Sequence, residues 1–412
     1  MSTLVFLNPD VPGIPAAVAP EALAGVPVLP PYSDAALAFA AALSEALLHA
    51  PQARAYPELT ALAFWLRRAN LTRLRDDVRQ QWQARTDAPV MVPRGTVLHI
   101  APANVDTIFV YSWMLALLSG NRNIVRVSTR ESPQAALLVD AVRCLLAEPA
   151  HHAIAQRTLL VRYAADEAVT ARLSAVCDVR VIWGGDDTVA ALRRIALPPT
   201  ATEICFPNKY SLALVSAAGW LAATPARQDE LAHAFHNDAY WFGQMACSSP
   251  RLVLWIGERG EAREASRDFW QRLGDIVAAR APALGEADYV NKLVAADALA
   301  IETRAEARNE GSNDLVRVWL DEPALHAARH CGAGLFFESS MPALTDLPAL
   351  LDRSVQTVAY AGFDAAELRR FIAASLPGGI DRIVPFGKAL AFAPVWDGLD
   401  LTRAFLREVS VY

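Results

Sequence analysis

Apolar and polar positions follow two different spacings along the chain. In residues 33–85 the apolar residues recur at helical spacing, with Arg, Asp and Gln on the opposite side, and Asp34 can cap the first helix. From residue 95, short apolar runs alternate with longer helical stretches. The predicted strands are 96–100, 123–128, 158–163 and 179–183, with others near 203 and 212, and the predicted helices are 105–118, 133–146, 167–176 and 187–195. This alternation indicates βαβ units and a mainly parallel sheet, which is an α/β fold.

The same alternation continues after a long predicted helix at 227–245. A second α/β portion begins with a strand at 252–256, and it includes a predicted helix at 261–280 and predicted strands at 315–320, 334–338 and 355–360. An open parallel sheet places its ligands outside the carboxyl ends of its strands. We therefore expect binding residues where the predicted strands end.

Length and composition narrow the class of protein. The 412 residues are 53% hydrophobic and 20% charged, with a formal net charge of −6, which excludes a largely disordered chain and argues against nucleic-acid binding through a basic face. No uninterrupted apolar stretch is long enough to span a membrane, and the N-terminus lacks a secretory pattern. The cysteines form no Cys-x-x-Cys motif or Cys/His cluster, and they are Cys144, Cys177, Cys205, Cys247 and Cys331. We expect a cytoplasmic protein without a zinc site.

Cys247 is the strongest candidate for a nucleophile. It lies between the predicted helix at 227–245 and the predicted strand at 252–256, and two serines and a proline follow it, so a turn with free backbone amides is expected. Such an amide can stabilise the oxyanion that forms when a thiolate attacks a carbonyl. The alternative is a small buried thiol, which is the usual environment of a cysteine.

Polar residues near the ends of the first predicted strands are candidates for ligand binding. Asn104 can polarise a carbonyl oxygen, or it can cap the helix that follows it. Arg126 ends the second strand, and Ser128, Thr129 and Arg130 come just beyond it. This cluster can hold a phosphate, or it can be a solvated strand end.

Two other patterns carry weaker chemical signals. One is the turn formed by Gly184, Gly185 and Asp186, which joins a predicted strand to a predicted helix. Its glycines let the backbone approach a ligand closely, and the helix N-terminus favours phosphate. The alternative is an ordinary turn, because Gly-Gly is common between a strand and a helix. His326 and His330 have the spacing of two metal ligands, but no third ligand is spaced to join them. We therefore exclude a metal enzyme.

Four segments carry a resemblance to a known family. Residues 101–105 (Ala-Pro-Ala-Asn-Val) with 118–121 (Leu-Ser-Gly-Asn) resemble a Pro-x-Asn turn and an Ala-Gly-Asn motif, and residues 124–128 resemble a strand that carries a nucleotide-binding Lys and Ser. Residues 244–250 (Gln-Met-Ala-Cys-Ser-Ser-Pro) and 378–390 (Gly-Gly-Ile-Asp-Arg-Ile-Val-Pro-Phe-Gly-Lys-Ala-Leu) are the most specific matches. From about residue 90 to the end, the chain resembles the aldehyde dehydrogenase superfamily, and most closely its acyl-CoA reductase branch, the LuxC family.

The resemblance implies a role for each matching position. Cys247 would be the nucleophile, and Asn104 would be the side-chain donor to the oxyanion. The strand end, the glycine turn and a Glu-x-x-x-Pro pattern would supply the cofactor-binding residues, which are Arg126, Ser128, Gly184, Gly185, Asp186 and Glu338. Glu338 would hold a ribose, and the glycine turn would lie against the cofactor phosphates.

Two departures from the family pattern bear on the chemistry. Arg126 stands where most of the superfamily has Lys, and Arg is well suited to phosphate. The hydrolytic Glu expected just before Lys209 has no clear counterpart, because Glu203 lies too early. A dehydrogenase that makes acids needs this base to activate water, whereas a reductase must keep water out.

The resemblance also implies a domain arrangement and an activity. We expect an aldehyde dehydrogenase-like fold with a helical segment at 1–90 packed on the cofactor domain, a nucleotide-binding domain at 91–220, a catalytic domain at 221–375, and a C-terminal segment at 376–412 that returns to the cofactor domain. The expected activity is reduction of a fatty acyl-CoA or acyl-protein thioester to an aldehyde with NADPH, or with NADH. We expect a homo-oligomer, and an acyl-protein synthetase or acyl-transfer protein as the partner that supplies the acyl group. The alternatives are a hydrolytic aldehyde dehydrogenase, an acyl-phosphate reductase and a non-catalytic scaffold subunit.

Overall fold

A computed structural model describes residues 4–11, 19–83, 89–280, 284–309 and 312–411. The chain divides into two units, one formed by residues 1–207 with 392–412 and the other by residues 208–391. The sequence led us to place the corresponding boundaries near 220 and 375. The first one differs because β8 (Tyr210–Ser216) is hydrogen-bonded between two strands of the second unit's sheet.

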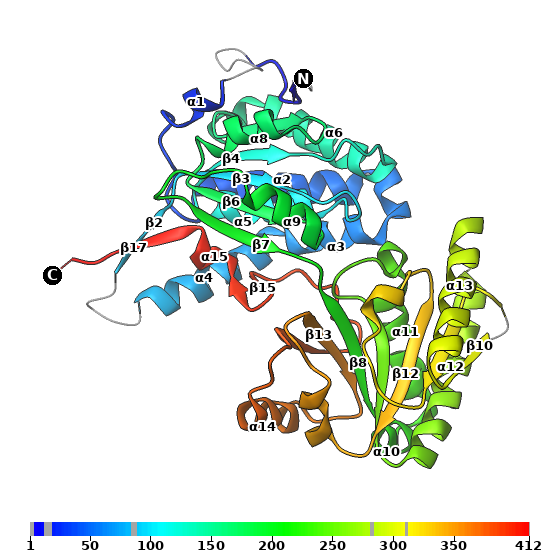
Figure 1. Cartoon of the computed structure of the whole chain (residues 1–412). Helices are drawn as coiled ribbons and strands as arrows, with labels where there is room; N and C mark the ends of the chain where they lie inside the picture. The colour runs from blue at the N-terminus through cyan, green and yellow to red at the C-terminus, as the bar shows by residue number, and fades with distance from the viewer. Residues whose placement is uncertain (1–3, 12–18, 84–88, 281–283, 310–311, 412) are drawn as a thin grey trace. The chain divides into compact units, whose positions relative to one another are not determined.

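The first unit contains a six-stranded sheet (Figure 1) with the order β1-β5-β4-β3-β6-β7. The strands are β1 (Val5–Phe6), β3 (Thr96–Ile100), β4 (Arg122–Arg126), β5 (Thr158–Arg162), β6 (Val179–Trp183) and β7 (Thr202–Phe206). All are parallel to their neighbours except β1, which is antiparallel to β5. The predicted parallel sheet is therefore present, and β3, with every residue buried, lies at its centre.

Helices surround this sheet, and two of them begin at other residues than the sequence suggested. Ser33, not Asp34, caps α2 (Asp34–His49), because its side chain accepts a hydrogen bond from the Ala36 amide. The entirely buried α5 (Ile108–Leu118) begins after Thr107 and not near 105. The other helices are α1 (Pro20–Leu23), α3 (Pro57–Trp65), α4 (Arg68–Gln83), α6 (Pro133–Ala147), α7 (His152–Ala155), α8 (Glu167–Ser174), α9 (Asp186–Arg193) and α15 (Leu401–Ala404).

Of the C-terminal segment expected at 376–412, only residues 392–412 belong to the first unit, because β14 (Arg382–Pro385) is a strand of the second unit's sheet. There β17 (Leu406–Val409) pairs antiparallel with β2 (Val90–Pro93) as a two-stranded ribbon, and β15 (Val395–Trp396) pairs with β16 (Leu399–Asp400). The Asn121 amide donates to the Phe405 carbonyl at 3.0 Å. These contacts tie the end of the chain to the first unit.

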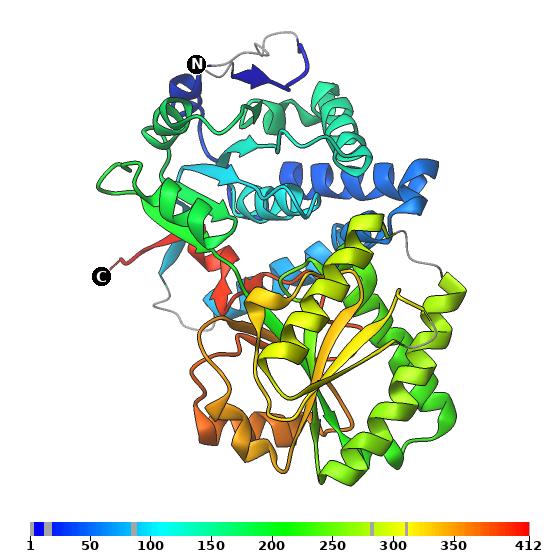
Figure 2. The same cartoon turned by 45° about the vertical axis from the view of Figure 1, so that its right-hand side comes forward.

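The second unit is a seven-stranded sheet (Figure 2) with the order β10-β11-β12-β9-β8-β13-β14. Its strands are parallel except at the edge, where β10 is antiparallel to β11. The strands after β8 are β9 (Pro250–Ile256), β10 (Ala305–Asn309), β11 (Val316–Leu320), β12 (Leu335–Met341), β13 (Val355–Ala361) and β14 (Arg382–Pro385). The helices are α10 (Ala217–Leu221), α11 (Pro225–Tyr240), α12 (Arg259–Arg280), α13 (Glu286–Glu302) and α14 (Ala365–Ser375).

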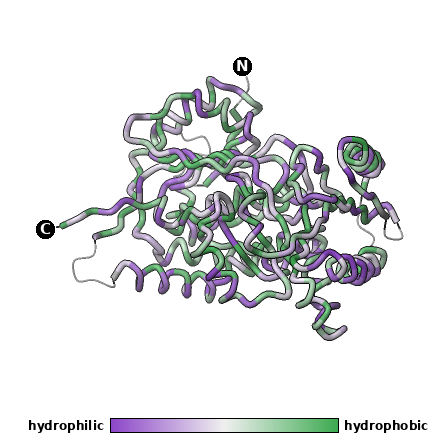
Figure 3. The backbone as a smooth tube through the Cα atoms, turned by 60° about the horizontal axis from the view of Figure 1, so that its bottom comes forward, coloured by the Kyte–Doolittle hydropathy of each residue, from purple (hydrophilic) through white to green (hydrophobic). Residues whose placement is uncertain are grey.

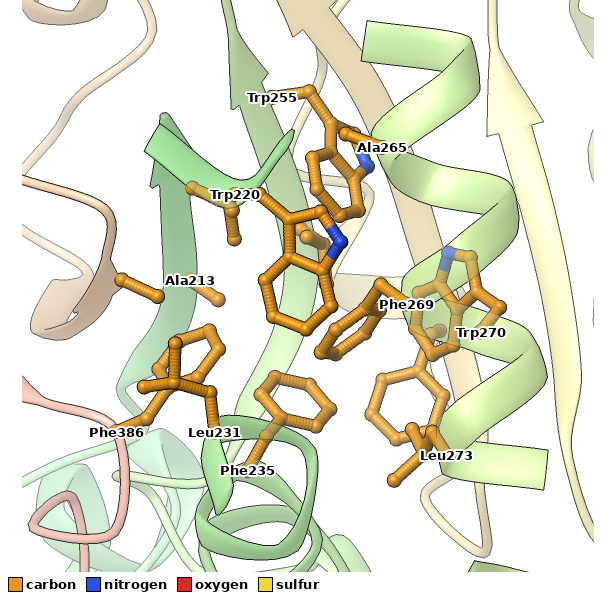
Figure 4. Packing of buried hydrophobic residues seen from close by; sticks show 14 of the residues in the cluster. Ala213, Trp220, Leu231, Phe235, Trp255, Ala265, Phe269, Trp270, Leu273 and Phe386 are labelled. Atoms are coloured by element: carbon orange, nitrogen blue, oxygen red, sulfur yellow. The ribbon is translucent and has the colours of Figure 1, made fainter. Parts of the chain in front are cut away.

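An aromatic cluster joins one face of this sheet to α10, α11 and α12 (Figure 4). Phe269 of α12 lies at its centre, with its ring 5.1 Å from Phe235 and 5.3 Å from Trp220, both nearly edge-to-face. These arrangements are the favourable ones for aromatic pairs and add to the hydrophobic gain of burying large rings. The cluster therefore fixes the strands whose ends carry the site described below.

Green and purple stretches alternate along the helical parts of the tube (Figure 3), as expected for helices that bury only one side. The helix α5 is an exception, because all its residues are buried. Within the described residues, none of the helices combines the length and the apolar character needed to span a bilayer.

Candidate active site

The amino-terminal ends of the parallel strands in the second unit bring several polar side chains together. The strand order β14-β13-β8-β9-β12 places Asp381, Gln356, Lys209, the segment containing Cys247 and the segment 330–335 in succession along one edge. Sequence reasoning found Cys247 in this group but not the neighbours that other strands bring to it.

The segment before Cys247 has an unusual backbone conformation. Phe242, Gly243 and Gln244 all have left-handed φ angles, of 56°, 58° and 64°. This turn ends α11 at Tyr240, earlier than the predicted end at 245. A left-handed conformation costs roughly 1–2 kcal/mol at each non-glycine residue, so other contacts must hold the turn.

The side chain of Gln244 provides those contacts. It is fully buried, and its Nε2 donates to the carbonyls of Pro250 and Leu335, both at 3.0 Å. Its Oε1 accepts from the Gly334 amide at 2.9 Å. Because Pro250 begins β9 and Leu335 begins β12, Gln244 attaches the turn to two strands at once.

The Cys247 thiol is half-buried and held from two strands. Gln356 of β13 donates from Nε2 to the sulfur, with 3.5 Å between the two atoms. The Ser211 hydroxyl of β8 donates to the Cys247 carbonyl at 2.6 Å. The sulfur therefore has a defined position and a hydrogen-bond donor beside it, which is suitable for a nucleophile.

His330 lies along the same edge but is not a base. Its Nδ1 accepts from the Gly332 amide at 3.2 Å, and its Nε2 is bonded to the Leu335 carbonyl at 2.9 Å, an arrangement that requires the neutral ring with its proton on Nε2. Burial, and then the nearby charge of Arg251, lower the pKa of His330 to about 3. The imidazole is thus neutral and fully hydrogen-bonded at physiological pH.

Asp381, which lies in the segment 378–390, helps to hold this edge of the sheet in place. Lys209 Nζ and Asp381 Oδ2 form a buried ion pair at 3.0 Å, and Lys209 also donates to the Arg353 carbonyl at 3.0 Å. The Asp381 amide donates to the Gln356 carbonyl at 2.8 Å. These contacts fix the start of β13, and with it the amide that faces Cys247.

Asn104 lies in the first unit, in the loop between β3 and α5. It is exposed, and its side chain makes no hydrogen bond to the rest of the described chain. Because α5 begins at Ile108 with Thr107 in the capping position, the helix-cap interpretation of Asn104 is wrong. Its amide is available to a ligand, and its role as an oxyanion donor stays a prediction.

The carboxyl edge of the first sheet carries buried donors that lack partners. Arg126 lies 4.9 Å from the centre of the Tyr163 ring and donates from Nη2 to the Tyr163 carbonyl at 3.2 Å. Its Nε, the Nε of Arg162 and the Nε2 of Gln134 are buried without hydrogen-bond acceptors among the described residues. The Ser128 hydroxyl accepts from the Arg130 amide at 3.1 Å.

This donor-rich edge fits an anionic group such as a cofactor phosphate. Sequence reasoning selected Arg126 and Ser128 but missed Arg162 and Gln134. The signal for Arg162 was its place at the end of the strand next to that of Arg126, which becomes evident only once the strand order is known.

The glycine turn lies at the same edge of the first sheet. The Gly184 amide donates to the Phe206 carbonyl at 3.2 Å, and Gly185, in an extended conformation, precedes the first residue of α9. Asp186 and Asp187 place two carboxylates in the first helical turn. These charges favour the helix but repel phosphate, so this turn can offer a phosphate only its backbone amides.

Glu338 does not fit its expected role. The side chain is 1% exposed, and its Oε1 accepts from Arg317 at 2.9 Å. Its Oε2 accepts from Ser266 and Trp270, both at 2.7 Å, and from Trp255 at 3.1 Å. The carboxylate is enclosed between β12 and α12 and has no surface for a ribose, so the Glu-x-x-x-Pro pattern marks a structural residue here.

Glu203, the glutamate nearest to the expected hydrolytic position, accepts from Arg180 Nε at 2.8 Å and from Arg193 Nε at 3.2 Å. Within the described ranges, no group of three or more His, Cys, Asp or Glu side chains is placed to hold a metal ion.

Solved structures with the same arrangement are aldehyde dehydrogenases. A lactaldehyde dehydrogenase superposes with a TM-score of 0.63 at 14% identity, covering 96% of this chain and 89% of that one. An aldehyde dehydrogenase of Mycobacterium tuberculosis complexed with NAD⁺ superposes with a TM-score of 0.62 at 14% identity, covering 95% and 88%. The protein therefore has the aldehyde dehydrogenase fold, as the sequence predicted.

Within that fold, the family model described as "Acyl-CoA reductase (LuxC)" matches residues 43–407. The chain belongs to this family. A long-chain acyl-protein thioester reductase of Aliivibrio fischeri is 27% identical over 184 residues, which are 44% of this chain and 36% of that protein. Long-chain acyl-protein thioester reductase 2 of Photobacterium leiognathi is 27% identical over 170 residues, 40% and 33% of the two chains. These alignments thus span about a third of the relatives' length.

Proposed function

We propose that this chain reduces a long-chain acyl thioester to the aldehyde through an acyl-enzyme on Cys247, with NADPH as the reductant. The observation that carries the proposal is the environment of the Cys247 sulfur, which is partly exposed, has a fixed position and accepts a hydrogen bond from Gln356. Membership of the acyl-CoA reductase family supports the same chemistry.

The proposed reaction has two stages at the same sulfur. The Cys247 thiolate attacks the acyl carbonyl carbon, the resulting oxyanion collapses, and the bond to the donor sulfur breaks with release of the donor thiolate. When bound, NADPH supplies a hydride to the acyl carbon. The thiohemiacetal on Cys247 then collapses, which breaks its carbon–sulfur bond and releases the aldehyde with the thiolate restored. Splitting the reduction in this way replaces one difficult step by two easier ones.

The acyl donor is a thioester of CoA or of a partner protein. The names of the relatives, long-chain acyl-protein thioester reductases, support a protein donor for those proteins and suggest one for this chain. Turnover measured side by side with long-chain acyl-CoA and with an acylated carrier protein will distinguish the two donors. A scaffold subunit would reduce neither.

The acyl-enzyme itself can be tested without cofactor. Incubation with a long-chain acyl-CoA should add one acyl mass to Cys247, and hydroxylamine should remove it. Cys247→Ala should lose the adduct and turnover, whereas Cys144→Ala, at an exposed thiol, should keep both. Full labelling of Cys247→Ala would refute the assignment, and oxidation of a long-chain aldehyde to the carboxylic acid with NAD⁺ or NADP⁺ in a separate assay would identify a hydrolytic dehydrogenase.

The preference for NADPH rests on the donors at the carboxyl edge of the first sheet. NADPH carries an additional 2′-phosphate with nearly two negative charges, and the unpartnered Nε of Arg126 is a donor suited to it. Loss of a charge-assisted hydrogen bond costs roughly 1.5–3 kcal/mol. We therefore expect Arg126→Ala to weaken NADPH binding by about ten- to a hundredfold and NADH binding much less.

Direct binding titrations of both cofactors to wild type and Arg126→Ala will test this preference. An equal loss of affinity for NADH and NADPH would place Arg126 at the ribose or the diphosphate instead.

A further inference from the structure

Arg251 is a positive charge without an anionic partner in the part of the chain that the structure describes. Its guanidinium lies 5.8 Å from the centre of the Tyr210 ring, and its Nε is buried with no acceptor among the described residues. No described carboxylate forms an ion pair with it. Because an unpaired cation in a desolvated position is unfavourable, an anion is expected beside it.

Contacts between β8 and β9 fix the Cys247 backbone close to the start of the strand that carries Arg251. Ser211 follows Tyr210 in β8, donates to the Cys247 carbonyl, and pairs in register with Pro250, the residue before Arg251. Burial lowers the pKa of Arg251, and negative charge on Tyr210 or on Cys247 acts in the opposite direction. The thiolate form of Cys247 and the Arg251 guanidinium are thus close enough to interact electrostatically.

Gln356 approaches the same sulfur from β13. It is 2% exposed, its Nε2 lies 3.5 Å from the Cys247 sulfur, and its Oε1 accepts from the Thr357 hydroxyl at 3.4 Å. The bond to Thr357 orients the amide so that its N–H groups face the sulfur. A hydrogen bond of this kind favours the charged form of the acceptor.

We propose that Arg251 and Gln356 together hold the Cys247 sulfur as a thiolate, so that it attacks the acyl donor without a histidine base. This inference rests on the proposed function only in taking Cys247 as the nucleophile. Gln356 touches the reacting sulfur, whereas Arg251 is a positioning residue that acts through its charge.

The other charged groups along this edge are held by partners away from the Cys247 sulfur. Lys209 and Asp381 neutralise each other at 3.0 Å, and Arg382 donates to the backbone carbonyls of residues 389 and 391. His330 is neutral, and burial raises the pKa of Tyr210 so that its hydroxyl also stays neutral. We therefore expect Arg251 and Gln356 to determine the pH at which the Cys247 thiol loses its proton.

The test is the pH dependence of Cys247 alkylation by iodoacetamide in the full chain, without acyl donor or cofactor. Mass spectrometry follows the Cys247 peptide, with the exposed Cys144 as an internal reference. Arg251→Met should raise the midpoint by about one to three pH units, because a nearby opposite charge shifts a titration by that amount. Gln356→Met should raise it by about one unit, which slows alkylation at neutral pH roughly tenfold.

Two controls separate charge from structure. Arg251→Lys keeps the positive charge and should keep most of the wild-type midpoint. Arg353→Met removes an exposed arginine from the same sheet edge and should leave the midpoint unchanged.

An unchanged midpoint in both Arg251→Met and Gln356→Met would overturn the proposal. Slower acyl transfer with an unchanged midpoint would overturn it too, because Arg251 would then act on the acyl donor. The alkylation assay contains no acyl donor, so it can succeed or fail independently of the proposed reductase activity.

Discussion

Replacing Gln244 by Leu should destabilise the second unit and disorganise the segment around Cys247. Leu fills a similar volume but cannot make the three hydrogen bonds of the amide, to the carbonyls of Pro250 and Leu335 and from the amide of Gly334. The residue is fully buried, so water cannot replace these partners without opening the structure. The backbone strain at φ 64° remains, now without the contacts that offset it.

The magnitude follows from the three hydrogen bonds that are lost. One buried amide and two buried carbonyls, each losing a bond at about 1 kcal/mol, give a loss of about 3 kcal/mol. Gly243→Ala is the matched control in the same turn, because its new Cβ would have no atom within 4 Å. The left-handed conformation should then lower the free energy of unfolding of Gly243→Ala by about 1 kcal/mol.

Hydrogen–deuterium exchange of peptides from β9 and β12 measures the second unit separately from the first. Gln244→Leu should accelerate the slowest amides there roughly a hundredfold, and Gly243→Ala roughly fivefold. If the two variants exchanged at the same rate, the Gln244 hydrogen bonds would not be what holds the turn.

Three further changes test other residues. Asn104→Ala should lower turnover about a hundredfold with unchanged cofactor affinity if its amide stabilises the oxyanion, and near-normal turnover would contradict that role. Glu338→Gln should lower the free energy of unfolding by about 3 kcal/mol and leave the cofactor dissociation constant unchanged, whereas weaker cofactor binding at full stability would restore the ribose role. The pKa of His330 is lowered to about 3 from its ordinary 6.5, so the unfolded chain takes up the proton first and stability falls as the pH drops through this window. His330→Gln should reduce that slope by up to about 1.4 kcal/mol per pH unit in denaturation between pH 4 and 6, and an unchanged slope would show that His330 does not titrate there.

The sequence predicted the parallel sheets well because buried strands leave a strong local pattern. All residues of β3 and β6 are buried, and both strands match their predicted ranges. Helix ends were less accurate, since several polar residues compete to cap the same helix. Thr107 and Ser33 occupy the capping positions, and neither is distinguished by composition from Asn104 or Asp34.

The candidate site was predictable only where its residues are adjacent in the chain. Cys247 is marked by its own segment, which combines a helix end, a turn and a strand start. Gln356 and His330 reach that segment through the strand order β13-β8-β9-β12, which no local pattern reveals. The ribose-binding role expected for Glu338 does not fit its surroundings for a related reason, because a motif does not show which side of a strand its carboxylate faces.

The arrangement around Cys247 also bears on how an acyl-enzyme would be protected from water. A base strong enough to deprotonate a thiol could also activate a water molecule against the thioester. Along this edge of the described second unit, His330 is neutral with both nitrogens bonded, and Asp381 is paired with Lys209. Donors such as Gln356 and Arg251 stabilise a thiolate but accept no proton, so they can activate the sulfur without activating water. A nucleophile activated in this way suits a reductase, in which the acyl group must survive until hydride arrives.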